Sequence, residues 1–404
     1  MKLTHAGSLA LLLAACGGAE AGDLAKARID TLPGGIIRVT SDGPTAWTES
    51  SAMSLVEEHR FQGQDGTPSE LGEPPSLAVD DLGRIYVVDA KPAVIKVFAA
   101  DGRFIRTIGR EGEGPGEFRV GFIALRGEHL VLQDPQVART SVYDTAGTFL
   151  RSWHSSCCYW SDIQIDRENR IYVPSMSGAK RGDPPRGIPY VRWSLDGTEL
   201  DTVWVPRREP EKLWTVSLMQ GGKPVSAMIT SVPFMPEIAH ALHPEGGIVY
   251  GWSGNYEIVY SKEGSDSARV FGRAWAPDPV TAERRMAEVE SRIRANTGSW
   301  GEANVRSAFK VEDLPETLPA YENLRVDPAG RIWVRRWAVS DTTRTDFDVF
   351  DSAGAFLGPV TAPFKINPWS NQGWTREGLV TIIEDEEGRP TVVRLTLRTR
   401  DSGR

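Results

Sequence analysis

The stretch LGEPPSLAVDDLGRIYVVDAKPAVIKVFAADGRFIRTIG, residues 71–109, decides the fold. It holds four short apolar runs, each rich in β-branched or aromatic residues and each ended by Asp, Gly or Pro. Runs of this length and composition predict β-strands, and the Asp-Gly pair between the third and fourth runs predicts a tight hairpin. The stretch therefore predicts a four-stranded antiparallel unit of about forty residues.

The unit recurs along the chain. The second strand returns as GRIYVVD at 83–89, NRIYVPS at 169–175 and GRIWVRR at 330–336. An aromatic residue also stands four positions before a glycine five times, where a third strand would turn into a fourth: Phe98/Gly102, Tyr143/Gly147, Trp193/Gly197, Tyr260/Gly264 and Phe350/Gly354. One such unit cannot bury both of its faces, so the copies must stack on each other. The sequence predicts an all-β, six-bladed β-propeller of four-stranded antiparallel blades with a short helical insertion.

We expect the propeller to occupy residues 47–397. The blades are expected at about 71–109, 118–153, 160–205, 236–273, 321–360 and 366–397. The last unit is short of strands, so MSLVEEHRF at 53–61 should pair with it and close the ring, which removes a long exposed edge. Residues 17–46 are expected to be a tether, in which the run at 36–39 could add an edge strand.

A helical insertion is expected at about 278–315. Thr281 is a residue type that caps helices, and Met286, Val289 and Ile293 follow at helical spacing with charges between them.

The first unit resembles the NHL-repeat β-propeller family. The likeness lies in PPSLAVDDLGRIYVVD, in IKVFAADGRFIRTIG and in GEGPGEF at 112–118. The chain as a whole is similar to the six-bladed propeller lipoproteins of bacteria, closely over residues 71–154 and more loosely to about 397. It departs from them in the last unit, where the aromatic-to-glycine signature is missing, and in its long insertions.

Residues 1–16, MKLTHAGSLALLLAAC, have the form of a targeting segment, with one basic residue and a short apolar run. The ending Leu-Ala-Ala-Cys resembles the bacterial lipobox, which implies a lipid on Cys16; the alternative is a plain secretory signal. We therefore expect an exported protein, anchored by this lipid to the bacterial envelope and facing the periplasm or the cell surface.

The composition, 40% hydrophobic and 25% charged, is that of a soluble globular protein. The formal net charge of -8 argues against nucleic acid as a partner. No Gly-x-Ser-x-Gly, phosphate loop or EF-hand loop is present, and no cofactor is expected.

The long segments of the chain should share one face. In a four-stranded blade, the connection from the second to the third strand and the connection to the next blade emerge on the same side. The insertions 175–189, 206–235 and 274–320 fall at such connections, and we call this side the elaborated face. The opposite turns are tight, and their carboxylates (Asp80, Asp81, Asp166 and Asp327) are expected to be structural Asx-turn residues. Functional residues are usually carried by loops on a rigid scaffold.

The motif HSSCCYW at 154–160 lies between the second and third blades. Cys157 and Cys158 could form a strained vicinal disulfide, remain as thiols, or bind a soft metal with His154. Tyr159 and Trp160 add aromatic binding surface. We expect this loop to border a pocket at the channel mouth, partly covered by the helix around 281–294.

Two further sets of residues are candidates. His240, in a first strand, is the only histidine that could join His154 near the propeller axis, as a weak metal ligand pair. Basic residues gather in the insertions and at the end of one second strand: Lys180, Arg181, Arg186, Arg207, Arg208 and Arg336. They are either a solvated rim or a surface for an acidic partner or a glycan.

The sequence favours a binding or scaffold module for an envelope protein, peptide or glycan. The alternative is a metal-dependent hydrolase or lyase with its site at the mouth of the central channel.

Overall fold

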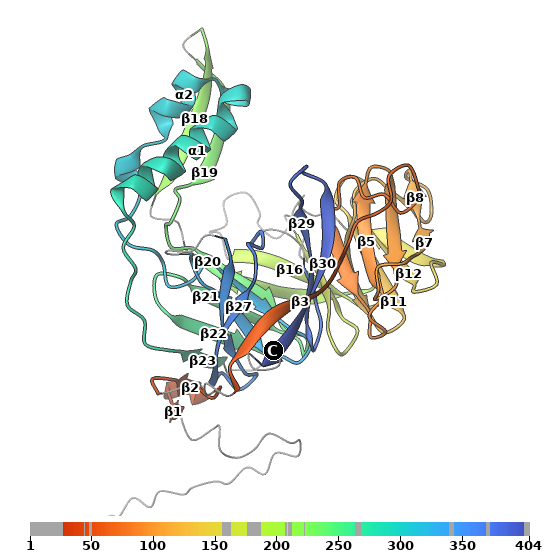
Figure 1. The fold of residues 1–404 in the computed structure, drawn as a ribbon, viewed down its shortest axis with the longest axis horizontal. Coiled ribbons are helices and arrows are strands. Elements are labelled where there is room, and N and C mark those ends of the chain that lie inside the picture. Colours follow the sequence, from red (N-terminus) through yellow and green to blue (C-terminus); the bar gives the residue numbers. More distant parts are fainter. Residues whose placement is uncertain are drawn as a thin grey trace, which may run out of the picture.

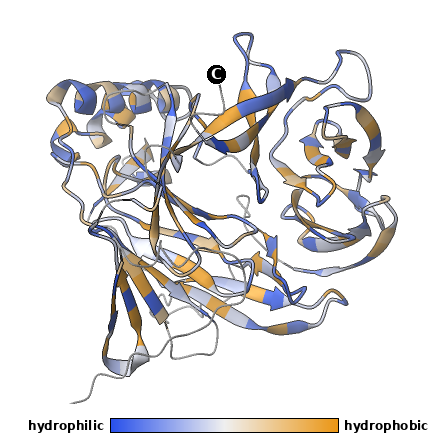
Figure 2. Cartoon of the chain, turned by 60° about the horizontal axis from the view of Figure 1, so that its bottom comes forward, coloured by the Kyte–Doolittle hydropathy of each residue, from blue (hydrophilic) through white to orange (hydrophobic). Residues whose placement is uncertain are grey.

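The computed structural model describes residues 27–43, 45–47, 51–155, 163–175, 187–206, 208, 212–221, 223–262, 268–338, 343–368 and 372–399. These residues form a six-bladed β-propeller of four-stranded antiparallel blades (Figure 1), as the repeats predicted. Hydrophobic residues are concentrated along the strands and hydrophilic residues in the turns (Figure 2). This distribution is expected where both faces of a blade pack against neighbours.

The strands of the first three blades have the following bounds. Blade one contains β4 (Ser76–Val79), β5 (Ile85–Ala90), β6 (Ala93–Phe98) and β7 (Phe104–Ile108). Blade two contains β10 (Phe122–Arg126), β11 (His129–Asp134), β12 (Arg139–Asp144) and β13 (Phe149–His154). Blade three contains β14 (Gln164–Ile165), β15 (Ile171–Pro174), β16 (Gly187–Trp193) and β17 (Glu199–Pro206). A short parallel pair, β8 (Arg110–Glu111) and β9 (Glu117–Phe118), connects blades one and two.

The other three blades complete the ring. Blade four contains β20 (Ile238–Leu242), β21 (Ile248–Trp252), β22 (Glu257–Ser261) and β23 (Ala268–Gly272). Blade five contains β24 (Asn323–Val326), β25 (Ile332–Arg335), β26 (Thr345–Phe350) and β27 (Phe356–Ala362). Blade six contains β28 (Gly373–Trp374), β29 (Gly378–Glu384), β30 (Pro390–Thr399) and, as its outer strand, β3 (Met53–Phe61).

The aromatic-to-glycine signature has a packing origin. Gly102 has φ +83°, and a Cβ there would lie 2.7 Å from the ring of Phe61 on the outer strand of blade six. Gly147 would clash in the same way with Ile108 of blade one. The signature glycine thus supplies both the left-handed turn conformation and the space for the preceding blade.

The propeller ring is closed by β3, the segment 53–61 that the sequence predicted for this role. β3 pairs antiparallel with β30, in a register that sets Leu55 opposite Leu397 and Phe61 opposite Val392. Because β30 lies near the end of the chain, this pairing joins the two ends of the propeller sequence and covers an edge that would otherwise be open.

Residues 28–40 correct the boundary expected for the tether. They form β1 (Arg28–Thr31) and β2 (Ile37–Thr40), and β2 pairs in parallel with β23, with Val39 opposite Phe271. Val39 is buried in the core between blades four and five. β2 thus confirms the edge strand that the run at 36–39 was expected to add, whereas β1 is largely exposed. Residues 17–26 lie outside the described residues.

The two largest insertions pack on each other, which the sequence did not predict. The 206–235 segment forms a hairpin of β18 (Leu213–Gln220) and β19 (Lys223–Ser231). It packs against α1 (Ala282–Trp300) and α2 (Glu302–Ala308), and the rings of Trp214 and Phe309 stack 4.4 Å apart. Figure 1 shows this module, at the top, projecting away from the propeller.

The helix begins as expected. The Thr281 hydroxyl accepts a hydrogen bond from the Arg284 amide at 3.1 Å and caps α1. Val289 and Ile293 are buried against the hairpin, whereas Met286 is 51% exposed. The helix predicted from the spacing of Met286, Val289 and Ile293 is therefore confirmed. Its buried face is narrower than predicted, because Met286 does not belong to it. No helix in the described ranges is both long and apolar enough to cross a membrane.

The tight turns opposite the elaborated face are held by their own carboxylates. Asp80 Oδ1 accepts the Leu82 and Arg84 amides at 3.0 and 2.8 Å, and its Oδ2 accepts the Arg84 guanidinium at 2.5 Å. The same arrangement recurs at Asp166 and Asp327, and also at Asp385 in the β29–β30 turn of the elaborated face. These residues are structural, as expected, while Asp81 is exposed.

Candidate functional site

The central channel is a small cavity of about 200 Å³ lined by the inner strands of all six blades. Its walls include the apolar stretch Leu77–Val79, Ile163 and Ile165, together with the polar side chains of Gln164, Arg126, Arg325 and Asp327. No histidine lines it in the described part of the chain. Across the same residues, no three His, Cys, Asp or Glu side chains are grouped so that they could hold a metal ion.

His240 does not reach the channel. Its Nε2 lies 2.9 Å from the Tyr190 hydroxyl, at the contact between blades three and four. The expected pairing with His154 near the axis is therefore wrong. Alternate residues of a strand point to opposite faces, and His240 lies on the face that packs against the neighbouring blade.

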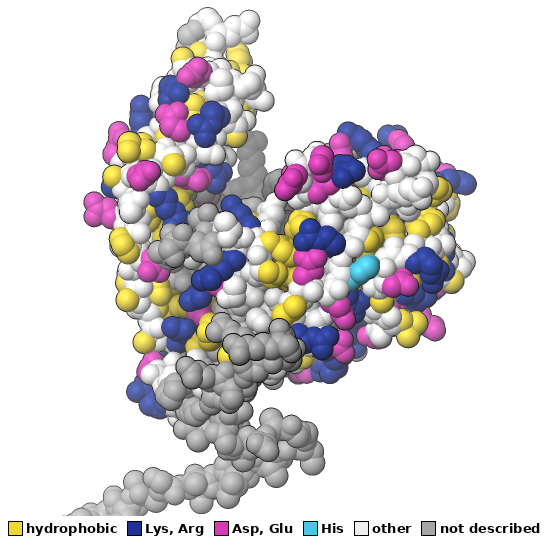
Figure 3. Space-filling model, in the orientation of Figure 1, with side chains coloured by type: hydrophobic (Ala, Val, Ile, Leu, Met, Phe, Trp, Pro, Cys, Tyr) yellow, Lys and Arg dark blue, Asp and Glu magenta, His cyan; other side chains and the backbone are white. Residues whose placement is uncertain are grey.

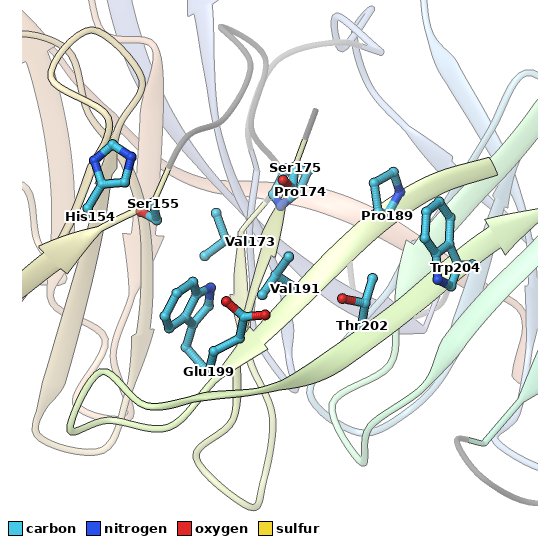
Figure 4. Close-up of a pocket in the computed structure, with 11 residues that line it drawn as sticks. His154, Ser155, Val173, Pro174, Ser175, Pro189, Val191, Glu199, Thr202 and Trp204 are labelled. Carbon is cyan, nitrogen blue, oxygen red and sulfur yellow. The ribbon is translucent and has the colours of Figure 1, made fainter. Parts of the chain in front are cut away.

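His154 does line a pocket, but not at the channel mouth. The pocket, about 250 Å³, lies between the end of β13 and the outer strands of blade three (Figure 4). Trp193, Glu199 and Trp204 form much of its wall, and α1 does not line it. The expectation that the helix covers this pocket is wrong, because α1 packs on the β18–β19 hairpin instead.

After His154, Ser155 is the last described residue before residue 163. The Ser155 hydroxyl lies 2.6 Å from the Thr140 hydroxyl, and the Ser155 carbonyl accepts a hydrogen bond from the side-chain amide of Gln133 at 3.0 Å. The candidates Cys157, Cys158, Tyr159 and Trp160 lie outside the described residues, as do Cys16, Lys180, Arg181, Arg186 and Arg207. The proposed disulfide and lipid remain predictions.

Two of the basic candidates are described, and they have different environments. The guanidinium of Arg208 stacks over the ring of Trp252 at 4.2 Å. Arg336 instead enters a pocket of about 380 Å³ with Arg273 and Arg344. We call this the arginine pocket.

The arginine pocket is assembled on the elaborated face from three parts of the chain. Tyr256 comes from the connection between β21 and β22. Arg273 to Asp278 and Pro319 to Ala320 are the two stems of the helical insertion, and Arg336, Trp337 and Arg344 come from the connection between β25 and β26. Asp346 and Asp348 alternate with the buried Phe347 and Val349 on β26, so both carboxylates face the pocket side of the blade.

Asp348 is the centre of the pocket. Its side chain is 2% exposed, and its Oδ2 accepts the Tyr256 hydroxyl at 2.7 Å and lies 3.3 Å from Arg273. Arg336 bridges both acids, at 3.8 Å from Asp346 and 3.8 Å from Asp348 Oδ1. Arg344 lies 3.4 Å from Asp346. The guanidinium groups compensate the cost of burying this carboxylate.

Burial, with the Asp348 charge as the second cause, raises the pKa of Tyr256 well above its usual value. Tyr256 therefore remains a neutral hydroxyl that donates to Asp348. The Arg273 guanidinium also lies over two aromatic rings. It is 6.0 Å from the Tyr256 ring centre and 4.7 Å from the Phe356 ring centre.

Several buried polar atoms of the pocket have no hydrogen-bond partner among the described residues. They are Asp348 Oδ1, Arg336 Nε and Trp337 Nε1. Since buried polar groups are nearly always paired in folded proteins, such a set marks a place where a ligand or solvent completes the bonding. The pocket therefore offers a ligand one hydrogen-bond acceptor, Asp348 Oδ1, and two donors, Arg336 Nε and Trp337 Nε1.

Sequence reasoning found only Arg336 of this pocket. One signal was available: TDFDVF at 345–350 places two acids on one side of a strand that is otherwise apolar. Buried carboxylates of this kind require partners. The partners themselves lie 75 and 92 residues away in the chain, at Arg273 and Tyr256.

A second and larger cavity, the mouth groove, also opens on the elaborated face. It has about 880 Å³ and lies over blades six, one and two. Pro74, Pro75, Val120, Phe364 and Ile383 give it apolar walls. Glu73, Lys365, Asn367 and Glu384 add polar groups to the same lining.

Comparison with known proteins agrees with this architecture. Residues 68–182 match a family model described as DUF5128, 6-bladed beta-propeller. A solved member of the DUF4221 family from Bacteroides vulgatus is similar over 87% of this chain and 99% of its own, at 10% identity and a TM-score of 0.50. A putative exported protein from Bacteroides fragilis covers 90% of this chain and 99% of its own, at 11% identity and a TM-score of 0.47. No curated protein matches the chain. At these identities the likeness concerns the fold alone.

Proposed function

We propose that the protein is an exported binding module, held at the bacterial envelope by a lipid on Cys16, that holds a protein, peptide or glycan partner on its elaborated face. The observation that carries the proposal is that the two largest of the four cavities described above open on this face, whereas the channel cavity, which reaches Asp327 in the opposite turns, is smaller. The arginine pocket and the mouth groove are both built from connections of the elaborated face. The turns on the opposite face are closed by their own Asp and Arg side chains.

The chemistry of the arginine pocket supports binding. Its charged groups hold each other in place, and a rigid set of donors and acceptors is what a specific ligand site requires. The lining of the mouth groove, which combines apolar with polar residues, has the composition of a recognition surface.

The charge distribution limits the partner. Lys and Arg side chains are interspersed with Asp and Glu on the face seen in Figure 3. Combined with the net charge of -8, this mixture does not favour a polyanion such as nucleic acid.

A binding assay with matched charge changes tests the proposal. The Cys16→Ala protein, taken from the soluble fraction, is labelled and added to sacculi, outer-membrane vesicles and envelope polysaccharide from the producing bacterium. Arg344→Glu, in the arginine pocket, should weaken binding by about tenfold or more. Asp81→Lys, on the opposite face, should leave binding unchanged. Equal loss in both variants, or binding in neither the parent nor the variants, overturns the proposal.

A further inference from the structure

The charges that line the arginine pocket are balanced. Three arginines (Arg273, Arg336 and Arg344) stand against three aspartates (Asp278, Asp346 and Asp348), so their formal charges cancel. Each arginine already lies within 4 Å of a carboxylate oxygen. An anionic ligand would have to compete with Asp346 and Asp348 for these groups, and it would add negative charge beside a buried carboxylate.

The unpaired atoms require a different kind of ligand. Asp348 Oδ1 needs a donor, while Arg336 Nε and Trp337 Nε1 need acceptors. A hydroxyl group is both donor and acceptor, whereas a carboxylate or a phosphate only accepts and an ammonium only donates.

The spacing of these atoms fits a hydroxyl group between them. Arg336 Nε and Asp348 Oδ1 are 3.8 Å apart, too far for a direct hydrogen bond. A ligand oxygen placed beside both can accept from the guanidinium and donate to the carboxylate. Both bonds would be charge-assisted and therefore among the stronger ones available.

The remaining lining suits a ring that carries several hydroxyl groups. Trp275 and Trp337, both partly buried, contribute indole surface to the same cavity. An indole can pack on the apolar face of a sugar ring while the hydroxyl groups at its rim reach the charged side chains. The volume of about 380 Å³ lies in the range of small-ligand pockets.

We propose that the arginine pocket binds an uncharged sugar unit of a glycan, with one hydroxyl group held between Arg336 and Asp348 and the ring packed against an indole. The inference rests on the proposed function, since it names the ligand class of one site on the elaborated face.

The test uses methyl glycosides of glucose, galactose and mannose and the matching hexuronates as probes. Binding is measured by saturation-transfer NMR and calorimetry on the Cys16→Ala protein. At least one neutral glycoside should bind and shift the indole N–H resonance of Trp337, identified by its absence in Trp337→Phe. Its affinity should exceed that of the corresponding hexuronate.

Variants locate the site. Arg336→Gln and Asp348→Asn should each weaken binding of the neutral glycoside about tenfold or more, because each removes one charge-assisted bond. Arg292→Gln is the matched control, since Arg292 is a half-exposed arginine of α1 that pairs with Glu288. Asp348 is buried, so thermal unfolding of all three variants is compared, and Arg336→Gln alone suffices if Asp348→Asn fails to fold.

Three outcomes overturn the inference: tighter binding of the hexuronate, no binding of any glycoside, or equal loss in Arg292→Gln. If the glycosides fail while Arg344→Glu still abolishes attachment to envelope material, the sugar assignment is wrong and the proposed function stands. If attachment does not map to the elaborated face, the proposed function fails, whatever the glycosides do.

Discussion

The rings of Phe61 and Phe98 lie 4.9 Å apart, and this contact ties the strand that closes the ring to the first blade. Phe61 is the last residue of β3, which belongs to blade six, while Phe98 ends β6 of blade one. Gly102 packs beneath the Phe61 ring. Blade six and blade one are thus joined by side chains as well as by the chain between them.

Phe61→Ala should lower the free energy of unfolding by about 2–3 kcal/mol, because it removes this contact and leaves a gap above Gly102. Chemical denaturation measures the change. The control is Leu82→Ala, where the side chain is 75% exposed and the effect should stay within about 0.5 kcal/mol. Equal effects at the two sites would show that the closure contributes no special stability.

Asp80→Ala should destabilise the fold by about 2–4 kcal/mol, since the carboxylate holds two backbone amides and the Arg84 guanidinium in a buried turn. Binding of envelope material should be unchanged at temperatures where the variant is folded. Asp81→Ala, one residue on and exposed, is the control and should be nearly neutral. A loss of binding in the folded Asp80→Ala protein would contradict the structural role.

Stability should fall below about pH 6.5 because of His243. This residue replaces the turn aspartate in blade four, is 2% exposed, and accepts the Glu245 amide at Nδ1. Burial is the main cause that lowers its pKa to about 4; Arg167 and Lys262 lower it further, and Glu245 and the Gly330 backbone oppose them. Between pH 6.5 and pH 4, His243 binds a proton in the unfolded chain but not in the folded protein. The free energy of unfolding therefore has its full value above pH 6.5 and declines towards pH 4.

The decline should be on the order of 3 kcal/mol, from a folded pKa of about 4 and an unfolded value of 6.5. Urea unfolding at pH 7.5 and pH 4.5 measures it. His243→Asn keeps an acceptor for the Glu245 amide but cannot titrate, and it should show a smaller difference between the two pH values. An unchanged difference in that variant would assign the acid sensitivity to other groups.

Cys16→Ala should move the protein from the membrane fraction to the soluble fraction without altering its melting temperature. The change removes the site of the expected lipid, and acyl chains supply the membrane affinity. Cell fractionation and immunoblotting follow the protein, with Cys157→Ala as a control that should stay at the membrane. A Cys16→Ala protein that remains in the membrane fraction would require a different anchor.

We expect Cys157 and Cys158 to be bonded to each other, because the proposed export would place them in an oxidising compartment, which favours disulfides. Mass spectrometry of the peptide that contains both should show a gain of two hydrogens after reduction. A peptide of the same mass with and without reductant would reject the bond. Cys157→Ser/Cys158→Ser should weaken ligand binding more than it lowers thermal stability if the loop serves the elaborated face.

The blades could be predicted because their signals are local. The turn at Gly102 and the strand before it require an aromatic residue and a glycine at fixed spacing, and this pattern recurs in five of the six units. The closing role of 53–61 was also predictable, since the last unit lacked a strand and a propeller has to cover its edge.

The features that were missed depend on contacts between distant segments. Val39 is buried where β2 pairs with β23 beside Phe271, and Trp214 is buried in a cluster in which Phe309 stacks on its ring. The arginine pocket likewise brings Tyr256 to Asp348 across a blade boundary. No spacing along the chain encodes such pairs.

The path of the N-terminal chain has a mechanical consequence. After β2 pairs with β23, the Ser41 amide donates to Gly272 and the Trp47 amide to Leu357 before the chain enters β3. A pull applied ahead of residue 27 meets β1 and β2 first, then the bonds at Ser41 and Trp47, and only then the strand that closes the ring. The outer edges of blades four and five therefore bear such a force first. Tension on the N-terminal chain would detach β1, β2 and the segment at Ser41 and Trp47 before it could separate β3 from β30 and open the propeller.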